Sequence, residues 1–119
     1  MKRIRTLAQL ELALAASTFL LFVHSTRSDT GGAAFREYEK WSARTPGTAT
    51  GWIDADEHGL LAESAFTSAR VPHDLPRAIF LRKGRPSWTG AGTAITQASL
   101  GSAFGLPLPA RDAGRPAAT

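Results

Sequence analysis

The N-terminal segment is the feature that most constrains what this chain can fold into. Three cations, Lys2, Arg3 and Arg5, precede residues 7–23, which are apolar apart from one glutamine, one glutamate, one serine and one threonine. A short basic segment followed by such a run is typical of a membrane-directed N-terminus. As a helix, residues 7–23 would extend about 25 Å, slightly less than the roughly 30 Å of a bilayer core. The pattern therefore predicts an N-terminal transmembrane helix.

Two forms of this membrane segment fit the residues. A cleavable secretory signal fits the basic start and the apolar run, although residues 24–29 are polar and charged where a cleavage site is expected. An uncleaved single-pass helix fits if Arg5 and His24 extend toward the two interfaces. The N-terminal cations favour a cytoplasmic N-terminus. We therefore expect localisation in the cell membrane, single-pass, with an extracytoplasmic C-terminal domain.

Glu11 distinguishes this segment from an ordinary anchor. A carboxylate in a membrane helix needs an interfacial position or a cationic partner, such as the amino terminus of a neighbouring subunit. The stretch 7–14 (LAQLELAL) resembles the N-termini of type IV pilins and type II secretion pseudopilins, which have glutamate at the fifth position. By that resemblance Leu7 would be the first residue after cleavage and Glu11 the assembly glutamate. Thr6 departs from the family, which has a small residue before the cut.

The composition of the chain changes after its first 30 residues. All 11 glycines and all 7 prolines follow that point, so we expect a helix up to about Ser28 and a break at Gly31–Gly32. A second helix is predicted over residues 33–43, because three aromatic residues there fall on one helical face.

Short strands and turns are predicted from residue 48 onward. The β-prone segments are 48–54, 60–63, 77–82, 87–89 and 93–100. The last three resemble the C-terminal hairpin of minor pseudopilins. The predicted fold class is α+β, with an N-terminal transmembrane helix, a short second helix, a small antiparallel β-sheet and a disordered C-terminal tail. The expected domains are residues 1–28 (basic leader and membrane-spanning helix), 29–110 (a small extracytoplasmic α+β domain) and 111–119 (the tail).

Few patterns point to catalysis or metal binding. The chain contains no cysteine, which excludes disulfides and thiolate metal sites within it. Asp54, Asp56 and His58 could hold a cation, but the other ligands of an EF-hand loop are missing, so we interpret the cluster as a charged turn. His73 and Asp74 accompany no serine in a nucleophile motif. We therefore predict no catalytic residue, no metal and no cofactor, and hence a protein that is not an enzyme.

Basic residues gather in the C-terminal part of the chain. Residues 76–119 contain six cations against the single carboxylate of Asp112. Cations beside an aromatic ring can hold phosphates and stack a base. The candidate residues for an anionic partner are Arg77, Arg82, Lys83, Arg85 and Trp88. The alternative to an anion-binding patch is an exposed hairpin turn with Trp88 in the core. Because we favour that alternative, nucleic acid is a less favoured partner than protein.

The expected function follows from the membrane segment and the pilin resemblance. We expect a membrane-anchored structural subunit of an envelope filament or of a secretion or DNA-uptake apparatus, with the membrane and other protein subunits as its partners. One alternative is a single-pass accessory subunit of a larger membrane protein complex. A second alternative is a secreted binding or hydrolytic domain whose first residues are removed.

Overall fold

Five strands form one mixed sheet that carries helices on both faces. The computed structural model describes residues 2–27, 29–45 and 47–105. The strands are β1 (Lys2–Arg3), β2 (Thr18–His24), β3 (Thr50–Asp54), β4 (Arg77–Arg82) and β5 (Arg85–Ala91). The helices are α1 (Leu7–Ala15), α2 (Asp29–Arg44), α3 (Gly59–Ala69), the 3-10 turn η1 (Gly92–Ala94) and α4 (Gln97–Gly105).

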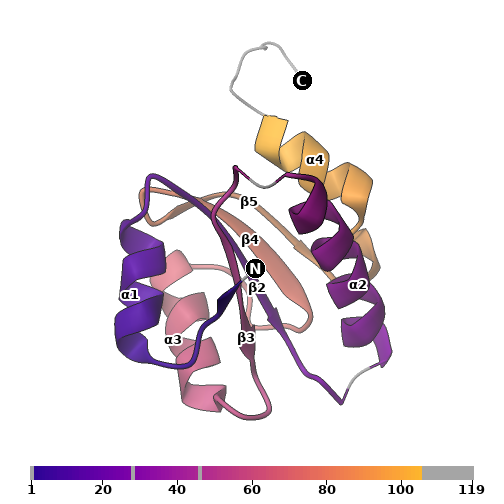
Figure 1. Ribbon diagram of the computed structural model, residues 1–119. Helices are drawn as coiled ribbons and strands as arrows, with labels where there is room; N and C mark the ends of the chain where they lie inside the picture. The colour runs from indigo at the N-terminus through magenta and orange to yellow at the C-terminus, as the bar shows by residue number, and fades with distance from the viewer. Residues whose placement is uncertain (1, 28, 46, 106–119) are drawn as a thin grey trace.

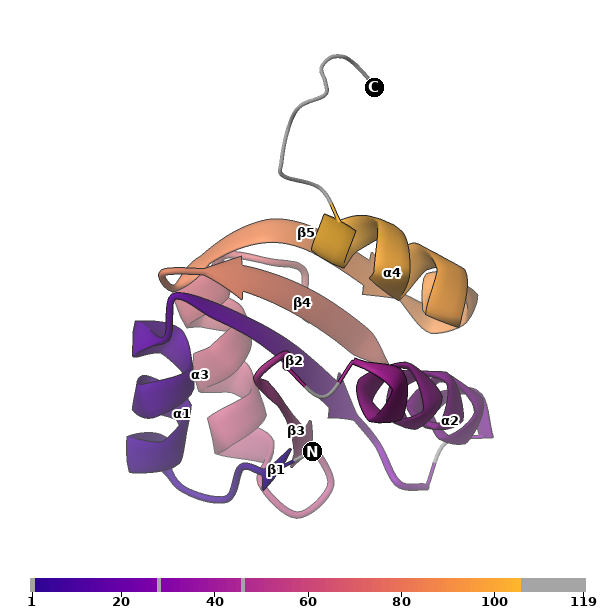
Figure 2. The same ribbon diagram turned by 45° about the horizontal axis from the view of Figure 1, so that its top comes forward.

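The sheet order is β1-β3-β2-β4-β5. β1, β3 and β2 run parallel, β4 is antiparallel to β2, and β5 is antiparallel to β4. Figures 1 and 2 show α1 and α3 on one face of this sheet and α2 and α4 on the other. The predicted α+β fold with a small antiparallel sheet is therefore wrong. The fold is α/β, in three layers.

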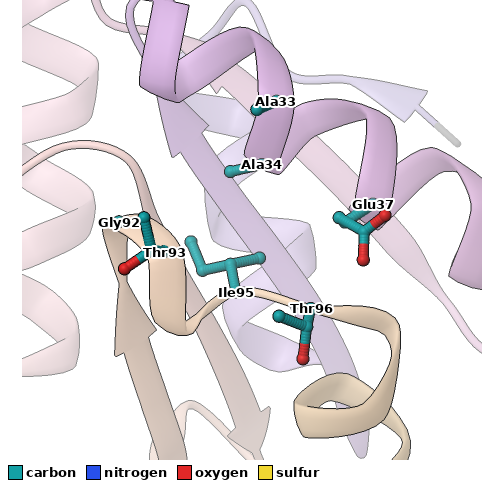
Figure 3. A pocket seen from close by; sticks show the side chains of 7 residues that line it. All are labelled: Ala33, Ala34, Glu37, Gly92, Thr93, Ile95 and Thr96. Atoms are coloured by element: carbon teal, nitrogen blue, oxygen red, sulfur yellow. The ribbon is translucent and has the colours of Figure 1, made fainter.

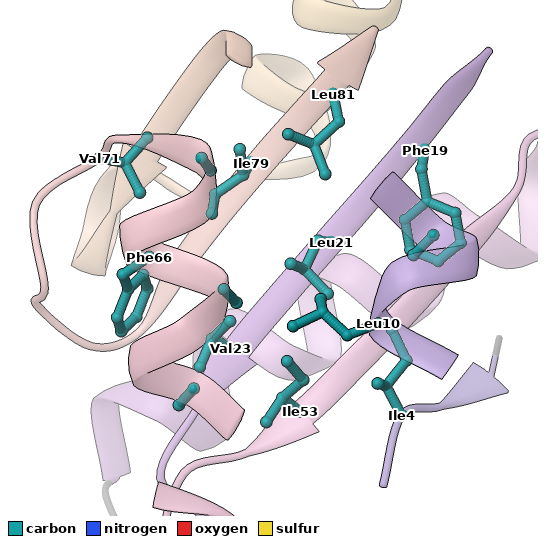
Figure 4. Packing of buried hydrophobic residues seen from close by; sticks show 14 residues of the cluster. Ile4, Leu10, Phe19, Leu21, Val23, Ile53, Phe66, Val71, Ile79 and Leu81 are labelled. Carbon is teal, nitrogen blue, oxygen red and sulfur yellow. The ribbon is translucent and has the colours of Figure 1, made fainter. Parts of the chain in front are cut away.

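The apolar run of the N-terminal segment is the central strand of the sheet. In β2, Phe19, Leu21 and Val23 pack with α1 and α3, whereas Leu20 and Phe22 pack with α2 and α4. Figure 4 shows the first of these two clusters. A strand buried on both faces needs a continuous apolar sequence, and such a run has no periodicity that distinguishes it from a membrane helix.

The predicted transmembrane helix is contradicted by this arrangement. None of the helices in the described ranges is both long enough and apolar enough to cross a bilayer. The helical part of the segment, α1, has nine residues, and β2 follows it after a short turn. β2 pairs with β3 and β4, so the first 28 residues and the later chain share one sheet.

Thr6 begins α1 by capping it. Its hydroxyl accepts the amide of Gln9 at 3.1 Å, and the Gln9 side chain accepts the amide of Thr6 at 3.3 Å. This reciprocal arrangement is a capping box, and its sequence signature is the spacing of threonine and glutamine three residues apart. The residue that departs from the pilin pattern is thus a helix N-cap.

The elements predicted after the N-terminal segment are partly confirmed by the structure. The helix over 33–43 is confirmed, although α2 begins at Asp29 and contains Gly31–Gly32 instead of breaking there. The strands over 48–54, 77–82 and 87–89 are confirmed by β3, β4 and β5. The strands over 60–63 and 93–100 are wrong, because residues 60–63 lie in α3, residues 93–94 in η1 and residues 97–100 in α4. The expected tail at 111–119 lies outside the described residues.

Tyr38 joins α2 to the centre of the sheet. Its side chain is fully buried, and its hydroxyl lies 2.8 Å from the carbonyl oxygens of both Leu20 and Gly51. The same oxygen accepts the amide of Gly51 at 3.0 Å. Burial raises the pKa of the Tyr38 phenol, so this group remains a hydrogen-bond donor.

We expect Tyr38→Phe to lower the free energy of unfolding by about 1–3 kcal/mol, because it leaves buried backbone groups without a partner. Urea unfolding would measure the loss. The control is Ser42→Ala, which removes a half-buried hydroxyl 3.0 Å from Thr50 and should cost less. Equal losses in the two variants would contradict the role assigned to Tyr38.

Candidate functional site

One edge of the sheet gathers the ends of four strands. β2 ends at His24 and β3 ends at Asp54, while β4 starts at Arg77 beside the end of β5 at Ala91. α2 and η1 both begin at this edge. In open α/β sheets, ligands bind outside the carboxyl ends of the parallel strands, where the strand order reverses. α1 connects β1 to β2 on one face and α2 returns from β2 to β3 on the other, so the strand order reverses at this edge (Figures 1 and 2).

A groove of about 460 Å³ lies between α2 and the connection that follows β5. We call it the α2–η1 groove. Figure 3 shows the two walls facing each other across it. Its lining residues are Ala33, Ala34, Glu37, Gly92, Thr93, Ile95 and Thr96.

The walls of the α2–η1 groove are made of small side chains and backbone. Ala34 and Ile95 are buried and supply apolar surface. Gly92 has a φ of 58°, a left-handed conformation that glycine adopts without steric cost. The threonines of the connection and the Glu37 carboxylate, which accepts the amide of Gln97 at 3.2 Å, add polar groups. A mostly apolar cleft with a few polar groups is the usual character of a binding site.

The loop before β4 adjoins the α2–η1 groove. The amide of Gly92 donates to the carbonyl of Pro76 at 2.9 Å, and the Leu75–Pro76 peptide is cis. Leu75 is 41% exposed. The loop therefore places one exposed apolar side chain beside the groove.

Arg77 anchors this loop from the start of β4. Its side chain is buried and contacts the carboxylate of Asp74, with Nε to Oδ1 at 2.8 Å. It also donates to the hydroxyl of Thr89 at 2.7 Å. The hydrogen bond from Arg77 lowers the pKa of Asp74. Arg77 is thus a structural cation of this edge.

His24, at the end of β2, is the most unusual side chain at this edge. It is 3% exposed, and neither ring nitrogen has a hydrogen-bond partner among the described residues. Its ring stacks on Phe35 with centroids 4.5 Å apart and planes 12° apart, and lies 5.1 Å from the ring of Trp52. Burial lowers the pKa of His24, against the opposing effect of the Asp54 and Asp56 carboxylates. The imidazole is therefore held neutral.

Carboxylates at the end of β3 and just after it hold the loop that follows His24. Asp56 accepts the hydroxyl of Ser25 at 2.7 Å and the amide of Arg27 at 3.2 Å. The bond from Ser25 lowers the pKa of Asp56. Asp54 accepts the hydroxyl of Thr26 at 3.4 Å from the same loop, and the guanidinium of Arg3 at 3.3 Å from β1. These hydrogen bonds assign the carboxylates to fixing the loop. The described residues contain no group of three or more His, Cys, Asp or Glu that could hold a metal ion.

The residues singled out in the sequence are spread over the molecule. Leu7 and Glu11 lie exposed on α1, where a carboxylate needs no partner charge. Of the candidate residues for an anionic partner, Arg77 lies at the edge described above. Lys83 and Arg85 lie at the opposite end of the hairpin formed by β4 and β5. Trp88 packs against the cluster under α2 and α4.

Sequence reasoning missed both the α2–η1 groove and His24. Residues 93–100 were expected to form a strand, which would leave no wall opposite α2. His24 was assigned to a membrane interface. The usable signal was the abrupt change from apolar to polar residues at His24, which is typical of a buried strand ending just before a helix.

Solved structures resemble this fold closely. A putative oxidoreductase with a thioredoxin fold matches with a TM-score of 0.80 and 16% identity, over 87% of this chain and 92% of the other. Thioredoxin from Fasciola hepatica matches at 0.67 and 15%, over 86% and 94%. Thioredoxin from Trypanosoma brucei brucei matches at 0.68 and 16%, over 86% and 85%. No family model and no curated protein matches the sequence.

These matches show that the chain has a thioredoxin-like fold, and at such identities they show the fold alone. They contradict the resemblance to pilins and pseudopilins, and with it the membrane-anchored structural subunit. The single-pass accessory subunit and the membrane localisation are wrong for the same reason and because no described helix could span a bilayer. The expectation of a non-enzymatic protein is contradicted too, since the matched proteins are thioredoxins and a putative oxidoreductase.

We expect the stability of the protein to fall as pH decreases from 7 to 5. Unfolding exposes His24, whose pKa then returns to about 6.5, so the unfolded chain binds a proton that the folded chain excludes. The contribution of neutral His24 to stability is fully present above pH 6.5 and is lost as the pH falls from there toward the lowered pKa of the folded state. Urea unfolding at several pH values would measure the decline.

The control is His24→Phe, which retains an aromatic ring in the stack and removes the titrating group. Its stability should vary less over the same pH range. The Asp56 and Asp74 carboxyls have lowered pKa values, so their stabilisation is lost only at more acidic pH. Equal pH dependence in the wild type and His24→Phe would contradict the assignment.

Proposed function

We propose that this chain is a thioredoxin-fold protein whose α2–η1 groove binds an extended segment of a partner protein. The observation that carries the proposal is the lining of the groove. Small side chains on α2 and a glycine on the facing wall leave room for another backbone to approach closely. Backbone groups and threonine hydroxyls on the rim can hydrogen-bond a peptide, and the exposed Leu75 nearby offers an apolar contact.

The chemistry that follows binding is limited by composition. Thiol–disulfide exchange starts with attack by a thiolate, and this chain has no cysteine. Any thiol in such a reaction would come from the partner or from a third molecule. The contribution that we assign to this chain is therefore recognition in the groove, which its own residues can provide.

Filling the α2–η1 groove tests this function. Ala33 is exposed and lines the groove, so Ala33→Arg should block a peptide while leaving the core unchanged. A library of extended peptides, selected on the full chain and measured by fluorescence anisotropy, should yield ligands that bind the variant at least about tenfold more weakly, which corresponds to about 1.4 kcal/mol.

The matched control is Ala8→Arg, which places the same side chain at an exposed position of α1 on the opposite face of the sheet. It should bind the selected peptides as the wild type does. Peptides that bind Ala33→Arg and Ala8→Arg equally well would refute the groove as the binding site, as would a selection that yields no ligand.

A further inference from the structure

A second hollow, of about 620 Å³, lies at the end of the molecule opposite the α2–η1 groove. Its lining comes from the end of α3 (Ser68, Ala69 and Arg70) and from the start of β5 with the preceding turn (Gly84, Arg85 and Pro86). Figures 1 and 2 show this turn near the upper ends of α1 and α3. The amide of Lys83 donates to the carbonyl of Ser17 at 3.0 Å, which fixes the turn to the segment after α1. We call this site the basic hollow.

Arg70 and Lys83 have an unusual backbone conformation. Their φ values are 58° and 53°, and within the described ranges they are the non-glycine residues with positive φ. This conformation is less favourable for a residue with a Cβ than for glycine. Arg70 occupies the position after α3 where glycine is strongly favoured, with its amide bonded to Thr67 and the next amide bonded to Phe66. Both positions place a cation beside the same hollow.

The positive charge of the basic hollow is largely uncompensated. In the described part of the chain, no ion pair involves Arg70, Lys83 or Arg85, and no acidic side chain lines the hollow. The C-terminal ends of α1 and α3 lie nearby, and the helix dipole gives each of them about half a negative charge. Together they offset about one of these three positive charges. An anion placed there would meet a net attraction.

We infer that the basic hollow binds a small ligand with two adjacent phosphate groups, such as inorganic pyrophosphate or the diphosphate of a nucleotide. Arg70 and Arg85 come from opposite walls, and each planar guanidinium can hold one phosphate through two hydrogen bonds. Lys83 adds a third positive charge from the adjoining turn, and the Ser68 hydroxyl adds a donor. The volume is in the range of sites for small ligands.

Two of the residues predicted from the sequence to bind an anionic partner, Lys83 and Arg85, belong to the basic hollow or its adjoining turn. Arg77 is excluded because it is buried against Asp74 near the other site. Trp88 is excluded because it packs on the face of the sheet under α2 and α4, whereas the hollow opens beside α3. Arg82 lies over the ring of Phe80. Without an aromatic ring among its lining residues, the hollow favours a compact phosphate ligand over single-stranded nucleic acid.

Nuclear magnetic resonance titration of the full chain with inorganic pyrophosphate at low ionic strength tests the inference. Amide shifts should concentrate at residues 68–70 and 83–86. Arg85→Gln should weaken binding about tenfold or more, since it removes a charge-assisted bidentate contact. The matched control is Lys40→Gln, which removes an exposed cation on α2 and should leave the affinity unchanged.

Arg70→Gly separates binding from folding. It relieves the left-handed strain, so the urea midpoint should rise while pyrophosphate affinity falls about tenfold or more. Three results would overturn the inference: equal weakening by Lys40→Gln and Arg85→Gln, inorganic sulfate binding as tightly as pyrophosphate at matched ionic strength, or displacement of pyrophosphate by a twelve-nucleotide single strand at much lower concentration. None of these results bears on peptide binding in the α2–η1 groove.

Discussion

Burial of β2 on both faces is the constraint on which the rest of the structure depends. Residues 19–23 are buried and apolar, and successive side chains enter opposite cores. Each such side chain contributes about 1.5–3 kcal/mol when it leaves water, which is large beside the 5–15 kcal/mol that separates folded and unfolded domains. Both helix layers must therefore be present before the strand is stable, and removal of either would expose half of its side chains.

The same strand ends in polar residues, and this change of character creates the functional edge. Past Val23 the chain leaves the cores at His24 and enters a loop held by the carboxylate of Asp56, which follows β3. α2 then begins, and its small residues leave a groove against the connection after β5. A neutral imidazole without a hydrogen-bond partner among the described residues is retained between aromatic rings at this point. Its burial costs stability, which is common for groups near functional sites.

The sequence predicted elements well where periodicity or turn residues were present. α2 has an aromatic face with helical spacing, and the turn at Lys83–Gly84 separates two β-prone segments, so α2, β4 and β5 were found. β2 was missed because a run buried on both faces carries no alternation. α3 was missed because alanines supply most of its buried face, and alanine gives a weak hydrophobic signal. The α2–η1 groove could not be found, because its walls are far apart in the chain.

The hairpin of β4 and β5 connects the two sites. One end of β5 continues into the wall of the α2–η1 groove, and the other end forms part of the basic hollow. Seven extended residues span about 20 Å, which is longer than a diphosphate or the width of a bound peptide. A partner protein and a phosphate ligand can thus occupy the chain together without colliding. Because β5 lies under both sites, it would also keep an anion bound in the basic hollow at a fixed distance from a protein bound in the α2–η1 groove.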